Sequence, residues 1–159
     1  MPNDGYTSPT PLNILVVGAK GRAGQLVTEY ALHAGNKVTG FSRKVEAEFP
    51  LSHPNLCLIN GDVLNIQALE NALQGQDAVI STLGSMEGEH SILHRGMRAL
   101  VIAMESQGIK RIIALGGAGI LNTPAGDFRY LEDGFPENLR PVTEAHLEAY
   151  RHLVTSELD

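Results

Sequence analysis

Two patterns of apolar residues alternate along the chain: short apolar runs and longer stretches of helical period. The short runs predict five strands, at residues 12–17, 37–42, 56–59, 77–81 and 110–115. The longer stretches predict helices that begin after the turn at 18–24, after Asn65, near residue 89 and near residue 142. Strands that alternate with helices favour parallel pairing through right-handed crossovers. We therefore predict the α/β class, with a doubly wound parallel sheet between two layers of helices (α/β/α).

The apolar residues also predict which face of each element is buried. Nearly all-apolar strands are typical of a sheet that helices cover on both sides. In the helices we expect the inward-facing residues to be Ala23, Leu26, Val27, Tyr30 and Ala31; Ile66, Leu69 and Leu73 after the capping residue Asn65; Leu93, Met97, Leu100, Val101 and Met104; and, as a half-buried stripe, Val142, His146, Tyr150 and Leu153. Residues 116–139 have no periodicity, and we expect a functional loop there, at the carboxyl ends of the strands.

Gly18, Gly21 and Gly24 lie between the first predicted strand and the first predicted helix. Their spacing, G-x-x-G-x-x-G, is a variant of the G-x-G-x-x-G dinucleotide fingerprint. Such a turn directs backbone N–H groups and the positive end of a helix dipole toward one point, which suits a phosphate group. The alternative is a tight strand-to-helix turn that binds nothing.

Ser42, Arg43 and Lys44 follow the second predicted strand, where NAD-binding proteins carry an acidic residue. A carboxylate there would repel a 2′-phosphate, whereas the Arg43 guanidinium offers it a fork of donors, so the sequence favours NADP over NAD. The alternative is a solvated loop. After the third strand, Asp62 is placed to accept a hydrogen bond from an adenine amino group while Val63 covers the ring. Asp62 is equally placed to cap the next turn, and the two roles are compatible.

Small residues follow the next two predicted strands, at Leu83-Gly84 and at Gly116-Gly117. They leave room for a ribose and a nicotinamide at the same end of the sheet. His90 and His94 share a helical face but have no carboxylates nearby at ligand spacing, so we predict no metal site.

Composition and charge narrow the classes of protein. The 159 residues suffice for one domain with a hydrophobic core, which we place at 12–159 after a flexible tail at 1–11. The formal net charge of −6 argues against a nucleic-acid or anionic-membrane surface, and no apolar run is long enough to span a bilayer. The one cysteine, Cys57, has no disulfide partner, and the first residues do not look like a signal peptide, so we expect a cytoplasmic location.

Together these segments resemble the atypical short-chain dehydrogenase/reductases of the NAD(P)H-binding, NmrA-like type, and in particular the flavin reductase/biliverdin reductase B branch. The matching segments are ILVVGAKGRAG, VTGFSRK, INGDV, DAVISTLG, KRIIALGG and RPVTEAHLEAYRHL. The resemblance implies a Rossmann-like fold that binds NADP(H). It places the pyrophosphate on backbone groups from Ala19 to Ala23, the 2′-phosphate on Arg43, the adenine on Asp62-Val63 and the nicotinamide ribose on Leu83-Gly84. The complete set of expected cofactor contacts is Gly18, Ala19, Lys20, Gly21, Arg22, Ala23, Gly24, Ser42, Arg43, Lys44, Asp62, Val63, Leu83, Gly84, Gly116 and Gly117.

The residues expected to act in catalysis match this family less well. None of the four tyrosines is followed four positions later by a lysine, so the Tyr-x-x-x-Lys pair of ordinary short-chain dehydrogenases is absent. Gly117 stands where the flavin reductase branch carries a serine. His146 coincides with a histidine of that branch, and Tyr150 lies one helical turn later on the same face, so these two residues are the catalytic candidates.

Three functions stay open on the sequence. The first is an NADPH-dependent reductase that passes hydride to a small conjugated acceptor such as a flavin, a quinone or a tetrapyrrole-like compound. The second is a non-catalytic NADP(H) sensor of the NmrA-like type, and the third, which the missing tyrosine pair disfavours, is a sugar-nucleotide epimerase. Family members usually continue into a further strand. We therefore expect a C-terminally shortened chain whose exposed sheet edge invites homodimerisation.

Overall fold

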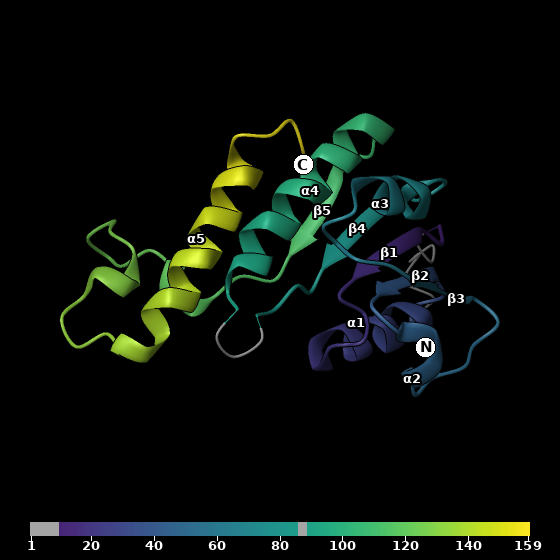
Figure 1. Cartoon of the computed structure of the whole chain (residues 1–159), viewed down its shortest axis with the longest axis horizontal. Coiled ribbons are helices and arrows are strands. Elements are labelled where there is room, and N and C mark those ends of the chain that lie inside the picture. The colour runs from purple at the N-terminus through teal and green to yellow at the C-terminus, as the bar shows by residue number, and fades with distance from the viewer. Residues whose placement is uncertain (1–9, 86–88) are drawn as a thin grey trace, which may run out of the picture.

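The computed structural model of the chain describes residues 10–85 and 89–159. One sheet contains the five strands β1 (Asn13–Val17), β2 (Lys37–Ser42), β3 (Leu56–Asn60), β4 (Ala78–Ser81) and β5 (Arg111–Ala114). Their spatial order is β3-β2-β1-β4-β5, and every neighbouring pair is parallel (Figure 1). The chain moves outward from β1 to β3 and then crosses to the other side of β1. This is the predicted doubly wound, Rossmann-like sheet, whose topological switch point lies between β1 and β4.

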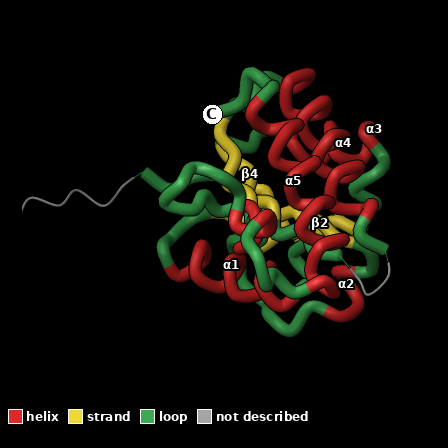
Figure 2. Tube along the Cα trace, turned by 90° about the vertical axis from the view of Figure 1, so that its left-hand side faces the viewer, coloured by secondary structure: helices red, strands yellow, loops and turns green. Residues whose placement is uncertain are grey.

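Helices form a layer on each side of this sheet, as predicted. The α-helices are α1 (Arg22–His33), α2 (Val45–Glu48), α3 (Ile66–Leu73), α4 (Ser91–Gln107) and α5 (Arg140–Val154). Figure 2 shows α1 on one side of the strands and α3, α4 and α5 on the other. The short α2 lies in a segment for which the sequence predicts no helix. The aperiodic segment 116–139 contains only 3₁₀ turns, at Ala118–Ile120, Arg129–Leu131 and Glu137–Leu139.

Alternate strand residues enter two separate hydrophobic clusters, one on each face of the sheet. One cluster joins Leu15, Val17, Phe41 and Val79 to residues of α3, α4 and α5, and the other joins Ile14, Val16 and Val38 to α1 and α2. The predicted inward face of α4 is confirmed, because all five of its residues are buried. The predicted cap of α3 is confirmed as well, since Asn65 Oδ1 accepts a hydrogen bond from Ala68 N at 3.1 Å.

The predicted inward face of α1 is wrong at two residues. Leu26 and Tyr30 are 55% and 72% exposed, whereas the buried residues of this helix are Gly24, Thr28, Ala31 and Leu32. The close approach of Gly24 to the turn sets the rotation of the helix: a Cβ on Gly24 would lie 2.3 Å from the carbonyl oxygen of Gly18. Residues four, seven and eight positions after Gly24 then face the sheet.

A further inward prediction is wrong at Ile66, which is exposed because α3 turns Leu69, Ala72 and Leu73 toward the core. The half-buried stripe predicted on α5 is confirmed at Val142, His146 and Leu153, whereas Tyr150 is 44% exposed. The fully buried residues of α5 are Thr143, Ala145, Leu147 and Ala149. The small residues among them let α5 lie close to its neighbours α4 and the turn at Ala118–Ile120.

The outer strands depart from the expectation that helices cover both faces of the whole sheet. Cys57 of β3 is exposed, and Ile113 of β5 is 55% exposed. Beside β5, Asp159 N donates to Lys110 O at 2.7 Å, and Ile112 N donates to Asp159 O at 2.9 Å. This is the hydrogen-bond pattern of a parallel bridge. Residue 159 therefore pairs with the outer edge of β5.

Three further expectations concern the N-terminal tail, the bounds of the domain and membrane-spanning helices. The flexible tail predicted at 1–11 falls mainly on residues 1–9, which lie outside the described residues. The single domain predicted at 12–159 stays a prediction. Of the helices in the described part of the chain, none has the length and apolar character needed to cross a membrane.

Candidate functional site

The glycine turn after β1 is tied to the end of β2. The amides of Gly18 and Ala19 both donate to Phe41 O, at 2.9 and 3.3 Å, and Gly21 N donates to Gly18 O at 2.9 Å. Gly18 has a φ of +84°, which glycine adopts at no steric cost, and a Cβ here would come within 3.0 Å of Thr82 O. Ala19 is fully buried. Gly18 and Ala19 thus hold the turn in place.

The first turn of α1 leaves backbone donors available to a ligand. The helix begins with the bond from Gln25 N to Gly21 O, at 2.9 Å, so the amides of Arg22, Ala23 and Gly24 have no intrahelical acceptor. Gly21 precedes the helix and supplies no side-chain cap. These amides and the helix dipole fit a phosphate group. Among the residues predicted to hold a pyrophosphate, Arg22 and Ala23 have free amides, whereas the amide of Ala19 already donates to Phe41 O.

Arg43 and Lys44 lie beside this turn, because the register of β1 and β2 pairs Val17 with Phe41. Both side chains are exposed at the carboxyl end of β2. The next acidic residue, Glu46, is engaged elsewhere: its Oε2 accepts a hydrogen bond from Asn60 Nδ2 at 2.8 Å. Among the side chains that the structure describes, none forms an ion pair with Arg43 or Lys44, and their positive charge fits a 2′-phosphate.

Asp62 and Val63 follow β3 at the same end of the sheet. Asp62 Oδ1 accepts a hydrogen bond from Leu64 N at 2.9 Å, which is the turn-capping role that the sequence allowed. Val63 is buried, and its Cγ1 lies 3.0 Å from where a Cβ on Gly96 of α4 would be. Little of the Val63 side chain is left to cover an adenine ring, whereas Asp62 is exposed.

The carboxyl ends of β4 and β5 complete this side of the sheet. Thr82 Oγ1 donates to Val17 O at 3.0 Å and fixes the start of the loop after β4. A Cβ built on Gly84 would meet no atom of the described residues within 4 Å. Gly116 and Gly117 follow β5. This arrangement fits the predicted space for a ribose and a nicotinamide.

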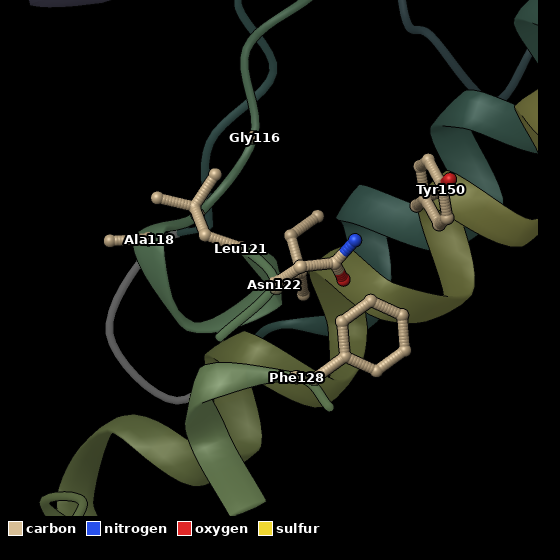
Figure 3. Close-up of a pocket in the computed structure, with 8 residues that line it drawn as sticks. Gly116, Ala118, Leu121, Asn122, Phe128 and Tyr150 are labelled. Atoms are coloured by element: carbon tan, nitrogen blue, oxygen red, sulfur yellow. The ribbon is translucent and has the colours of Figure 1, made fainter. Parts of the chain in front are cut away.

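A cavity of about 510 Å³ adjoins the end of β5 (Figure 3). Its lining comes from the segment after β5 and from α5: Gly116, Gly117, Ala118, Ile120, Leu121, Asn122, Phe128 and Tyr150. The sequence named Gly116, Gly117 and Tyr150 individually, and it predicted a functional loop at 116–139, the segment that supplies most of this lining. It did not single out Asn122 and Phe128, because they lie in a segment without periodicity and carry no motif.

The two catalytic candidates have different surroundings. Tyr150 lines the cavity. His146 lies next to Gly117, with its Cδ2 atom 2.9 Å from the position that a Cβ on Gly117 would take. Burial lowers the pKa of His146, so the imidazole is neutral at neutral pH. Tyr150 thus borders the cavity itself, whereas His146 lies against the backbone at Gly117.

His90 and His94 line a second cavity, of about 470 Å³, between the start of α4 and α5. Glu144 and Glu148 also line it, with the Arg151 guanidinium beside the Glu148 carboxylate. Within residues 10–85 and 89–159, no group of three or more His, Cys, Asp or Glu side chains is arranged to hold a metal ion.

Known proteins resemble this chain over nearly its whole length. The family described as NAD(P)H-binding matches residues 18–159, from the glycine turn to the last residue. Among solved structures, a protein of Burkholderia pseudomallei with the provisional name of an exported protein is 32% identical. It superposes with a TM-score of 0.80, over 93% of this chain and 69% of that chain.

Two more distant structures share the fold. A short-chain dehydrogenase/reductase from Veillonella parvula, solved in complex with NADP, is 24% identical with a TM-score of 0.72, over 93% of this chain and 66% of its own. A protein of Streptococcus pneumoniae, provisionally named an NADH-flavin reductase, is 24% identical with a TM-score of 0.73, over 91% and 66%. The chain also spans 65% of the length of a curated relative that it matches.

Proposed function

Because the chain belongs to the NAD(P)H-binding family, we propose that it binds NADPH along the carboxyl edge of its sheet and passes hydride to a small conjugated acceptor. One observation carries this proposal. Four features follow one another along neighbouring strands of the sheet. Exposed positive charge follows β2, free helix amides follow β1, a glycine without close neighbours follows β4, and a cavity adjoins the end of β5. The order of these features matches the order of chemical groups along NADPH, from its 2′-phosphate to its nicotinamide, with an acceptor beside the nicotinamide.

Each feature has a distinct role in the proposal. The amides of Arg22, Ala23 and Gly24 hold the pyrophosphate, and Arg43 holds the 2′-phosphate. Tyr150 lies against the acceptor in the cavity. When bound, NADPH supplies the hydride and becomes NADP⁺, and the reduced acceptor takes its proton from water, so no acidic side chain is required. A flavin or a quinone suits such a site.

The names of two similar structures support the proposal. The Veillonella parvula protein was solved with NADP bound, and the Streptococcus pneumoniae protein carries the provisional name of an NADH-flavin reductase. We also propose a cytoplasmic location, which the unpaired Cys57 supports. Localisation of the tagged protein by cell fractionation tests it, and recovery outside the cytoplasm would contradict it.

Replacement of Arg43 tests the cofactor preference. Arg43→Ala is expected to raise the Kd for NADPH by about 10- to 100-fold, because it removes charge-assisted hydrogen bonds to the 2′-phosphate. The Kd for NADH is expected to stay the same, since NADH has no such group. Nicotinamide fluorescence measures both constants. Arg98→Ala, at an exposed position on α4, is the matched control and should bind both cofactors like the parent protein.

Equal affinity of the parent protein for NADPH and NADH, or an unchanged preference in Arg43→Ala, would contradict the proposed 2′-phosphate site. The hydride-transfer part is tested separately, by NADPH oxidation with a panel of flavins and quinones. The absence of a Tyr-x-x-x-Lys pair favours a second candidate, the NADP(H) sensor. Tight NADPH binding with no oxidation by any acceptor is the result expected for that sensor.

A further inference from the structure

A small hairpin at residues 121–129 presents two side chains of the cavity as a pair. Thr123 N donates to Asp127 O at 2.8 Å, and Arg129 N donates to Leu121 O at 2.9 Å. These bonds flank an antiparallel bridge between Asn122 and Phe128. Residues in such a non-hydrogen-bonded pair lie directly opposite each other, with their side chains on the same face. The backbone therefore fixes the Asn122 carboxamide beside the Phe128 ring.

Both side chains of this pair line the cavity, together with Tyr150 of α5. Figure 3 shows the Asn122 carboxamide directed toward the space between Phe128 and Tyr150. Among the residues that the structure describes, none forms a hydrogen bond with this carboxamide. Its donor and its acceptor are therefore both available to a ligand.

The rest of the cavity restricts the ligand further. Of the described residues, the eight that line the cavity carry no formal charge at neutral pH. A charged group placed there would lose hydration without gaining a partner, so a neutral ligand is favoured. The Phe128 ring offers a flat apolar surface for stacking.

We propose that Asn122 recognises the imide or lactam edge of a planar, neutral acceptor whose ring packs on Phe128, an inference that rests on the proposed function. A carboxamide presents an N–H donor beside a C=O acceptor, and an imide edge presents the complementary pair, so two parallel hydrogen bonds form. A quinone has carbonyl oxygens but no N–H, and it forms at most one of these bonds. Asn122 is thus a specificity-determining residue that favours flavin-like acceptors over quinones.

Two acceptors and two variants test this inference. Asn122→Ala is expected to raise KM for lumiflavin, which has an imide edge, by about 10-fold or more and KM for menadione, a quinone, by no more than about threefold. Phe128→Leu is expected to raise KM for both acceptors, because both stack on the ring. Asn138→Ala, at an exposed position outside the cavity, is the matched control. The KM for NADPH should be unchanged in all three variants.

Binding without turnover separates this inference from the proposed function. Quenching of lumiflavin fluorescence in the presence of NADP⁺ measures its Kd, and Asn122→Ala is expected to raise that Kd by the same factor as KM. If the parent protein binds lumiflavin but oxidises no NADPH, the proposed reductase activity fails while the role of Asn122 is still tested. The inference is overturned if lumiflavin fails to bind the parent protein, if Asn122→Ala binds it equally well, or if menadione is affected to the same extent.

Discussion

Gly117 and His146 illustrate how single residues shape the candidate site. The Gly117 backbone borders the cavity, and the imidazole of His146 occupies the space that a side chain at position 117 would need. A serine at this position, as in the flavin reductase branch that the sequence resembles, would have to displace the ring. The absence of a side chain at Gly117 and the burial of His146 are therefore linked features of this chain.

Burial of His146 predicts that the protein loses stability in acid. Because burial lowers its pKa in the folded state, the unfolded chain binds more protons as the pH falls through the ordinary histidine range, so the free energy of unfolding decreases. His146→Gln should therefore show a smaller drop in Tm than the parent protein between about pH 8 and about pH 5. Thermal unfolding followed by circular dichroism measures the two drops.

His33→Gln is the control for this prediction, because His33 is exposed at the end of α1. It should keep the pH dependence of the parent protein. Equal drops in Tm for His146→Gln and the parent would show that the burial of this imidazole does not matter for acid stability.

At the scale of elements, the N-termini of α1 and α3 differ in a way that separates their roles. Asn65 satisfies the Ala68 amide at the start of α3. The residue before α1 is Gly21, which provides no side-chain cap. A helix whose first amides are satisfied internally serves the fold, whereas one whose first amides are left free suits an anion. Because α4 and α5 lack a side-chain cap as well, it is the place of α1 at the glycine turn after β1, together with its free amides, that favours an anion there.

The cap of α3 predicts a measurable contribution to stability. Asn65→Ala should lower the free energy of unfolding by about 1 kcal/mol, because the Ala68 amide loses its acceptor. For a chain of this size the Tm should fall by roughly 2–4 °C. Asn65→Ser keeps an acceptor oxygen and should recover most of the loss. Equal unfolding curves for the alanine and serine variants would contradict a capping role.

At the scale of the whole molecule, the strand β5 and the residue that follows it leave large apolar side chains exposed at the edge of the sheet. Ile113 and Leu115 are 55% and 54% exposed. In the described part of the chain, no strand lies beyond β5 in the sheet, and only Asp159 pairs with its outer edge. An apolar face beside an open strand edge favours association with a second copy, which offers the same surface across a two-fold axis.

We therefore predict that the 159-residue chain forms a homodimer through this face. Ile113→Lys combined with Leu115→Lys should shift the protein toward a monomer in sedimentation velocity at micromolar concentration, because two charges would be buried at the interface. Leu131→Lys, at a residue of matched exposure (57%) in the segment after β5, is the control and should leave the dimer intact. A monomeric parent protein, or equal effects of the two replacements, would contradict the prediction.

The sequence by itself determined the order of the strands and of the four longer helices, the glycine turn and the position of the charges that follow β2. These features depend on local periodicity and on residues close together in the chain, so pattern and chemistry suffice to find them. The α4 face and the Asn65 cap were predictable for the same reason.

Only the tertiary structure decided the rest. The buried face of α1 follows from the contact of Gly24 with Gly18 rather than from the apolar pattern, which pointed to Leu26 and Tyr30. The cavity wall depends on a hairpin that brings Asn122 beside Phe128 and on α5, which brings Tyr150 to them. Tyr150 is far from the hairpin in the chain, and the two contacts within six residues, of Gly24 with Gly18 and of Asn122 with Phe128, belong to no repeating pattern. Local sequence therefore indicates where a cofactor binds, and the packing of distant segments decides what lies next to it.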